Sequence, residues 1–500
     1  MTSGQRVALA LLLSAPMLGA AGDFLFHGRP IGINALLFSV AFVVTLAILL
    51  RIGKVPMHQG RRLMVVPLIL FAGMLAWHDS PLLLATNLLA VAGAVTLGAL
   101  RRSGGGRLRT SEISDYVAGA ASAGAATFAG TIELMEKDLP WQRIGATVRS
   151  HRSAALGRGL ALSLPFLALF GGLFVAADAV FRSLLVGAVP DLRHVWSHLL
   201  IAAGVAWLSA GLLRDLVASR DADRLVAPMA LTAGLPKVRL GSTEVAAALA
   251  ALDVLFLAFV IVQVRYLFGG QSLVQARVHL TYAQYARHGF FELVVVAMLV
   301  LPVLLLANAI VRERTRIVRG LSALLIGLVF VVLASALDRM RLYQREYGLT
   351  ELRVYATGLI LWLGVLLVWF ALTVVRGRPR AFAFGAILAG FAATVVLNAV
   401  NPDALIARTN LARPHVDVAY LGRLSDDAVP GLLERLPVLA EPRRRALAAA
   451  LLRRGEAHGG LLGWNASRTR ADRLLREHQA ELLTYAGVSA QAAVRELSKP

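Results

Sequence analysis

The chain has 500 residues, of which 57% are apolar and only 16% are charged, against roughly 25% charged residues in an average soluble domain. A soluble fold this poor in charge could not cover its surface with polar groups, so the composition excludes an ordinary soluble protein. Cysteine is absent, which excludes disulfides, thiolate metal sites and a cysteine nucleophile.

The formal net charge is +21, and a charge of this size would first suggest a nucleic-acid partner. The basic residues, however, lie mostly in short segments between long apolar runs. In a membrane protein such segments set the orientation of the helices and contact anionic lipid headgroups. We therefore expect membrane lipid, and no nucleic acid, as a partner.

Eleven apolar runs approach the roughly 20 residues that a helix needs to cross a bilayer. The third run is short and contains Pro67. The predicted fold class is all-α: a polytopic transmembrane helix bundle of about 11 spans with a small helical C-terminal tail outside the membrane. The predicted spans are residues 7–26, 31–50, 63–78, 81–100, 159–181, 195–213, 245–264, 289–311, 321–337, 354–375 and 381–400.

The first run also resembles a secretory signal. Arg6 precedes an apolar stretch from Val7 to Leu18, and the small residues Gly19, Ala20 and Ala21 follow it. We expect a retained helix, because a polytopic protein does not need a cleaved signal, and cleavage would leave the remaining topology unchanged.

Charge in the short loops predicts the orientation, since Lys and Arg concentrate on the cytoplasmic side. Residues 51–62 carry four basic residues, whereas the turn at residues 78–80 carries no Lys or Arg, so the N-terminus is expected in the cytoplasm. Residues 338–353 contradict this orientation in part, because it places their four Arg outside. Eleven spans then place the tail from Asn401 outside a bacterial cytoplasmic (inner) membrane.

Residues 101–158 decide the downstream orientation, because the Ala/Gly-rich stretch from Val117 to Ile132 could cross the bilayer or lie on it. Crossing would place five basic residues outside, so we expect a cytoplasmic segment with an interfacial helix over Trp141–Ala155. The predicted division is a four-helix membrane segment (1–100), a basic cytoplasmic linker (101–158), a seven-helix membrane core (159–400) and an extracytoplasmic helical tail (401–500).

The tail has the pattern of a small helical bundle. Arg443–Arg454 has amphipathic helical spacing, Gly455–Gly463 breaks the pattern, and a last helical stretch is expected from Arg468 to Tyr485.

Acidic residues inside spans are costly and invite a functional hypothesis. Asp253 lies deepest, followed by Glu292 and Asp178. Such acids would couple protons or cations in a transporter, or they would simply form interhelical hydrogen bonds; both readings remain open.

No pattern predicts a cofactor or a metal site. His194 and His198 share one helical face, but no third ligand follows at helical spacing, and we expect no metal there. A P-loop, a nucleophile elbow and a dinucleotide-binding fingerprint are missing from the sequence, which makes an enzyme the less favoured class.

Polar and aromatic residues concentrate in two predicted external loops and at the start of the tail. These residues would bind a lipid headgroup or an anionic ligand, or would form an aromatic belt with local ion pairs. Together with Asp253 and Glu292, the candidate functional residues are Arg265, Tyr266, Tyr282, Tyr285, Arg287, Asp338, Arg341, Tyr343, Arg345, Glu346, Tyr347, Asn401, Asp403, Arg408 and Asn410.

Several phrases resemble those of bacterial multi-pass membrane proteins in domain-of-unknown-function families of the 4153/4173 type. They are YLFGG (266–270), TYAQYARHGFFEL (281–293), DRMRLYQREYGLTELRVY (338–355), NPDALIARTNLAR (401–413) and DVAYLGRLSDDAVPGLL (417–433). The resemblance implies an inner-membrane protein and brings no activity, cofactor or catalytic residue. Its phrases fall in predicted external segments, which makes the outer face the expected functional surface.

Three functions compete. The first is a non-enzymatic sensor, scaffold or envelope-assembly component that binds an envelope protein or a lipid-linked ligand. The second is a transporter that uses Asp253 and Glu292. The third is a membrane transferase acting on a lipid-linked substrate, although such enzymes usually carry several acids in the first external loop, and here only Asp23 lies beside His27 and Arg29.

Overall fold

The structure, a computed structural model, describes residues 2–57, 59–100, 113–139, 192–217, 239–268, 290–414, 416–454 and 460–487, with single helical positions between 159 and 177. Within these ranges the regular structure is helical, apart from one isolated bridge between Leu240 and Val311. The predicted all-α fold class is therefore confirmed.

The first helix group surrounds an apolar core near the N-terminus. Its helices are α1 (Ser3–Phe26), α2 (Ile33–Gly53), α3 (Gln59–Met74), α4 (Pro81–Ala99), α5 (Ile113–Glu133) with the π-turn η2 (Leu134–Asp138), and α9 (Leu192–Val217). On α1, Leu11 and Leu18 are buried in this core, whereas Leu13 and Met17 are more than 70% exposed. Exposed leucine and methionine suit a lipid-facing surface.

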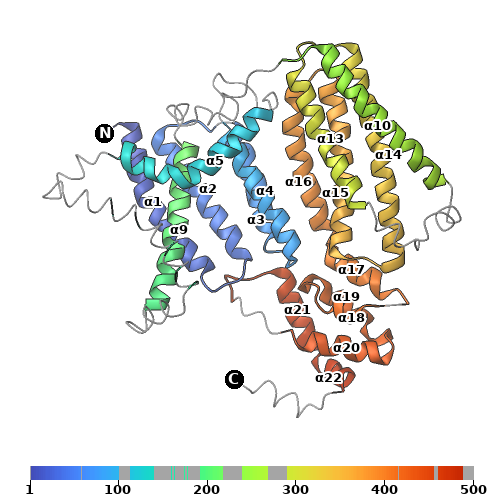
Figure 1. Cartoon of the computed structure of the whole chain (residues 1–500). Helices are drawn as coiled ribbons and strands as arrows, with labels where there is room; N and C mark the ends of the chain where they lie inside the picture. Colours follow the sequence, from blue (N-terminus) through green and yellow to red (C-terminus); the bar gives the residue numbers. More distant parts are fainter. Residues whose placement is uncertain are drawn as a thin grey trace.

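The second helix group forms a separate core. It contains α10 (Ser242–Phe268), α13 (Phe290–Ile310), α14 (Arg316–Tyr347), α15 (Glu351–Phe370) continued by the π-turn η4 (Ala371–Val375), the short η5 (Pro379–Ala381) and α16 (Phe382–Val400). Figure 1 shows the two groups side by side, with α4 and α16 nearest each other.

An amide pair joins the two groups inside the bundle. Asn87 on α4 and Asn398 on α16 exchange hydrogen bonds, with Nδ2 to Oδ1 distances of 3.1 and 2.9 Å. Both side chains are buried, and Phe391 of α16 packs on Phe71 of α3. Polar pairs of this kind hold helices together where no water competes for their hydrogen bonds.

A tail domain of short helices lies at the bundle end opposite the N-terminus (Figure 1). It comprises α17 (Pro402–Leu411), α18 (Val418–Leu421), η6 (Asp426–Ala428), α19 (Val429–Arg435), η7 (Leu436–Val438), α20 (Glu441–Leu452), α21 (Ala466–Glu477) and α22 (Gln479–Ala486). Its own apolar core includes Ile406, Leu432 and Leu447. The predicted helical stretch over 468–485 corresponds to α21 and α22, which are separated by a turn at His478.

Nine of the described helices are long and apolar enough to cross a membrane. They correspond to nine of the eleven predicted spans. The predicted third span is α3, which has 16 residues and is not among the nine, and the predicted span 159–181 lies almost wholly outside the described residues. The predicted interfacial helix 141–155 and Asp178 also lie outside them.

The predicted loop after residue 337 is wrong. The helix α14 continues through Asp338 to Tyr347 and ends at Gly348, whose positive φ of 76° suits glycine. Charged residues ended the apolar run in the sequence, but Arg339 and Met340 remain buried, so packing carries the helix past that point.

Candidate functional site

The two predicted intramembrane acids lie in different surroundings. Asp253 on α10 is 4% exposed, and among the residues that the structure describes neither of its carboxylate oxygens has a hydrogen-bond partner. Glu292 lies in the first turn of α13 and is exposed. Of these two candidates, only Asp253 is therefore a buried intramembrane acid.

The candidates around the predicted loop after the seventh span, between α10 and α13, divide by what the structure describes. Tyr282, Tyr285 and Arg287 lie outside the described residues, and Arg265 and Tyr266 are described only as backbone of α10. The structure therefore leaves these five predictions untested.

The candidates at the end of α14 form a mostly exposed surface. Asp338, Arg341, Arg345, Glu346 and Tyr347 are exposed, as is Arg408 on α17. Tyr343 is half-buried, with the Arg353 guanidinium 4.0 Å from its ring centroid. This stacking is a cation–π contact within the chain.

Asn410 and Arg413 attach the tail domain to the second helix group. The side-chain amide of Asn410 accepts from the Leu349 N–H at 2.7 Å and donates to the Leu349 carbonyl at 2.8 Å. Arg413 donates to the last carbonyls of α14, including that of Glu346 at 2.6 Å. An arginine at a helix C-terminus satisfies carbonyls that have no partner inside the helix.

The polar junction attaches the tail domain to the first helix group. We define it as His78, Asp79, Ser80, Asn401, Asp403, Ser425 and Asp427, drawn from the α3–α4 turn, the α16–α17 boundary and the turn before α19.

The Asp427 carboxylate is the centre of the polar junction. It lies 2.7 Å from His78 Nδ1 and accepts the backbone N–H groups of Asp79 and Ser80 at 2.8 and 3.1 Å. Asn401 Nδ2 donates to it at 3.2 Å. The Asp427 side chain is only 2% exposed, and these donors replace the water that burial removes.

Asp403 forms the second buried carboxylate of the polar junction. It is fully buried, and its Oδ2 accepts the backbone N–H of Ser425 at 3.2 Å as well as the Ser425 hydroxyl. The neighbouring Asn401 has a left-handed φ of 50° and caps α17 by accepting the Ala404 N–H. The predicted candidates Asn401 and Asp403 thus bind groups of their own chain.

A second contact with the same turn comes from α21. The Arg468 guanidinium lies 3.0 Å from the Asp79 carboxylate, and Asn465 donates to the carbonyls of Leu75 and His78 at 3.1 and 2.9 Å. The backbone N–H of Ala466 donates to the Ala76 carbonyl at 2.8 Å. The end of α3 is therefore held by both side chains and backbone of the tail domain.

Burial, hydrogen bonds and neighbouring charges shift the pKa values of the acids at and beside the polar junction. Burial raises the pKa of Asp79 to about 6, against the lowering effect of Arg468. Burial also raises the pKa of Asp426, although Arg454 pairs with that carboxylate at 2.8 Å. For Asp427 burial would raise the pKa as well, but the hydrogen bond and charge of His78 and the Asp79 N–H bring it below its usual value.

The sequence interpretation missed much of the polar junction. It treated His78, Asp79 and Ser80 only as a turn without Lys or Arg, and it omitted Ser425 and Asp427 from the candidates although the quoted phrase at 417–433 contains them. That phrase was the signal that could have identified the tail side. No local pattern identifies the partner turn, because the contact joins positions 349 residues apart.

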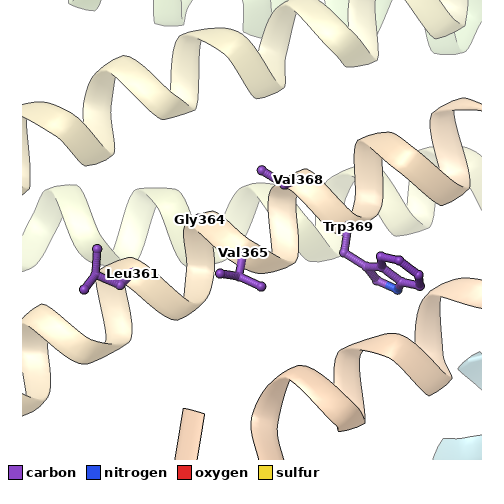
Figure 2. Close-up of a pocket in the computed structure, with 5 residues that line it drawn as sticks. All are labelled: Leu361, Gly364, Val365, Val368 and Trp369. Carbon is purple, nitrogen blue, oxygen red and sulfur yellow. The ribbon is translucent and has the colours of Figure 1, made fainter. Parts of the chain in front are cut away.

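An apolar groove on α15 offers no comparable chemistry. Figure 2 shows its lining residues Leu361, Gly364, Val365, Val368 and Trp369 along one helix. The indole N–H of Trp369 already donates to the Phe382 carbonyl at 3.1 Å. On a candidate membrane span, such a groove suits lipid chains.

Comparison with known proteins gives one match. A family model described as Domain of unknown function (DUF4153) matches residues 65–435, which include every residue of the polar junction. This confirms the resemblance to the 4153 type and leaves the 4173 type a prediction. No curated protein and no solved structure matches the chain.

Proposed function

Because the chain belongs to the DUF4153 family, described only as a domain of unknown function, we propose a role from its geometry. It is a non-enzymatic membrane component of the sensor, scaffold or envelope-assembly type. Its working face is the bundle end that carries the tail domain. Within this class the contacts favour a scaffold whose tail domain is held in a fixed position.

The observation that most directly supports this proposal is that the tail domain contacts both helix groups through buried polar groups. Asp427 binds the α3–α4 turn, and Asn410 binds the turn between α14 and α15. The backbone of Trp464 accepts the N–H of Ile33 at 2.8 Å, which adds the α1–α2 turn. A domain attached at three helix ends is positioned rigidly, as a platform for a partner requires.

The charge pattern supports an extracytoplasmic working face. The end of α13 and the start of α14 lie at the bundle end that also carries the N-terminus (Figure 1), and residues 312–319 there contain four Arg, as expected for the cytoplasmic side. The four Arg of residues 338–353 oppose this less strongly than their number suggests. Arg339 is buried and donates to Gln263 at 2.9 Å, and Arg353 stacks on Tyr343.

Thiol labelling tests the side of the membrane, because the natural chain contains no cysteine. Leu461→Cys places a thiol at a 90% exposed position of the tail domain, and Arg314→Cys places one at an exposed position of the other bundle end. A membrane-impermeant maleimide is expected to label only the first variant in intact cells. Labelling of the tail position only after lysis would contradict the proposed orientation.

Complementation of a deletion strain tests the scaffold role. Asp427→Ala is expected to lose rescue because the tail domain is no longer held on the α3–α4 turn. Glu313→Gln is the matched control, because that carboxylate is exposed between α13 and α14, away from the tail domain. Rescue by Asp427→Ala at normal protein level would contradict the proposal.

A proton- or cation-coupled transporter is the second candidate, and Asp253 is the observation that favours it. A buried carboxylate without a hydrogen-bond partner in a candidate span is costly and suits a proton-binding site. Asp253→Asn keeps the shape of the side chain. Loss of rescue in this variant at normal protein level would favour transport, whereas full rescue would favour the scaffold.

A further inference from the structure

Three possible metal ligands converge where α1 and α9 meet, on the side of the bundle that carries the tail domain (Figure 1). Asp23 and His27 occupy successive turns at the end of α1, and His198 lies near the start of α9. Asp23 Oδ2 lies 2.7 Å from His198 Nδ1, and Asp23 Oδ1 lies 3.5 Å from His27 Nδ1.

Small residues bring the two helices close enough for this contact. A Cβ added at Gly19 would lie 2.3 Å from the Ala202 carbonyl oxygen, and one at Gly22 would lie 2.7 Å from Val205. Gly22 directly precedes Asp23, and Ala202 lies one turn after His198. The helix contact therefore fixes the distance across which these side chains meet.

Two atoms of the cluster have unsatisfied bonding capacity. Within the described part of the chain, Asp23 Oδ1 and His27 Nδ1 are both buried without a hydrogen-bond partner, although they lie 3.5 Å apart. The imidazole rings of His27 and His198 stack with centroids 3.8 Å apart and planes within 16°. One carboxylate therefore faces two imidazoles, with Oδ2 close to His198 Nδ1 and Oδ1 farther from His27 Nδ1.

We propose that Asp23, His27 and His198 bind a divalent transition-metal ion, with Zn²⁺ as the probe ion. Two imidazole nitrogens and one carboxylate oxygen suit such an ion better than Mg²⁺ or Ca²⁺, which prefer oxygen ligands. The three ligand atoms lie within 4.8 Å of one another, and rotation of the two imidazoles out of their stacked arrangement would direct their nitrogens at one ion. His27 and His198 are 25% and 48% exposed, which leaves a route for the ion and a position for water.

The sequence did not predict this site, because only His194 and His198 on α9 were compared. The other two ligands, Asp23 and His27, come from the end of α1, and Asp23 lies 175 positions before His198. The side chain of His194, one turn earlier on α9, lies outside the described residues.

Zinc titration of the purified full-length protein tests the proposal. The chain is stripped with a chelator in detergent and titrated with Zn²⁺ against a chromophoric chelator. We expect one equivalent bound, with affinity at least about 10-fold weaker in Asp23→Asn and in His198→Gln, a loss known even for groups that only support ligands. His478→Gln is the matched control, because its Nδ1 contacts the Leu474 carbonyl in the tail domain.

Thermal unfolding provides a second readout. Zn²⁺ should raise the melting temperature of the natural chain in a concentration-dependent way, because binding to the folded state alone stabilises it. Asp23→Asn and His198→Gln should both lose this shift. Absence of a bound equivalent in the natural chain, or binding that survives both Asp23→Asn and His198→Gln, would overturn the proposal.

Discussion

His78 Nδ1 lies 2.7 Å from the Oδ1 of Asp427, although the two residues are 349 positions apart in the chain. One residue lies in the turn between two helices of the first group and the other in the tail domain. The contact joins the α3–α4 turn to a segment in the last third of the sequence. It therefore couples the placement of the tail domain to the correct assembly of the helix bundle.

Removal of the Asp427 carboxylate should destabilise the fold strongly. Asp427→Ala leaves the His78 imidazole and the N–H groups of Asp79 and Ser80 buried without their acceptor. Each buried donor left without its acceptor typically costs about 1–3 kcal/mol. Thermal unfolding in detergent measures the loss, and Asp338→Asn should stay within about 0.5 kcal/mol of the natural chain. Equal stability of the two variants would refute the central role of Asp427.

Acid should stabilise the folded state through Asp79, although protonation weakens its ion pair with Arg468. Burial raises its folded-state pKa to about 6, above the ordinary value of 3.8, so folding favours the protonated carboxyl. This contribution to stability is fully present below the ordinary pKa and is lost as the pH rises through 6. When the pH is lowered from 7.5 to 5, the natural chain should therefore gain melting temperature relative to Asp79→Asn, which lacks the titrating carboxyl. An identical pH dependence of the melting temperature in the two proteins would contradict the raised pKa of Asp79.

Close packing of α1 on α9 should make Gly19 intolerant of a side chain. Gly19→Ala places a methyl group against the Ala202 carbonyl, and overpacking of this kind costs about 1–3 kcal/mol. Gly204→Ala on α9 is the matched control, because nothing lies within 4 Å of its added Cβ. The control should be neutral or slightly stabilising, since alanine favours helix. Thermal unfolding of both variants checks the difference, and a tolerated Gly19→Ala would contradict the helix contact.

Asp253 should reduce stability in the natural chain. Its buried carboxylate lacks a hydrogen-bond partner, and an unsatisfied buried polar group costs about 1–3 kcal/mol. Asp253→Leu should therefore raise the melting temperature in detergent, whereas Glu292→Gln at an exposed position should leave it nearly unchanged. A lower melting temperature for Asp253→Leu would show that the carboxylate has a stabilising partner.

The sequence predicted the membrane helices well because hydropathy is a local property. Runs without charge identified α1, α2, α4 and the spans from α9 to α16, where lipid-facing residues must be apolar whatever their partners. The same rule failed at Asp338, where α14 continues beyond the apolar run because Arg339 and Met340 pack on neighbouring helices. Helix ends outside the apolar region depend on such contacts.

The candidate site was predicted only in part, because its contacts are long-range. Asn401, Asp403 and Asn410 were selected as polar residues in family-like phrases, and they do lie at the attachment of the tail domain. Their partners are groups of the same chain, such as Leu349, rather than an external ligand. Pairing between His78 and Asp427 depends on the folded topology, which no residue spacing encodes.

A cysteine pair tests the central claim, that the tail domain works while fixed to the bundle. Ala76→Cys with Ala466→Cys introduces two thiols at positions whose backbones are joined by a 2.8 Å hydrogen bond, in a chain without other cysteines. Oxidation in membranes should form an intramolecular disulfide, and the crosslinked protein should still rescue the deletion strain. Failure to crosslink, or rescue that is lost on oxidation and restored by a reducing agent, would contradict a fixed tail domain.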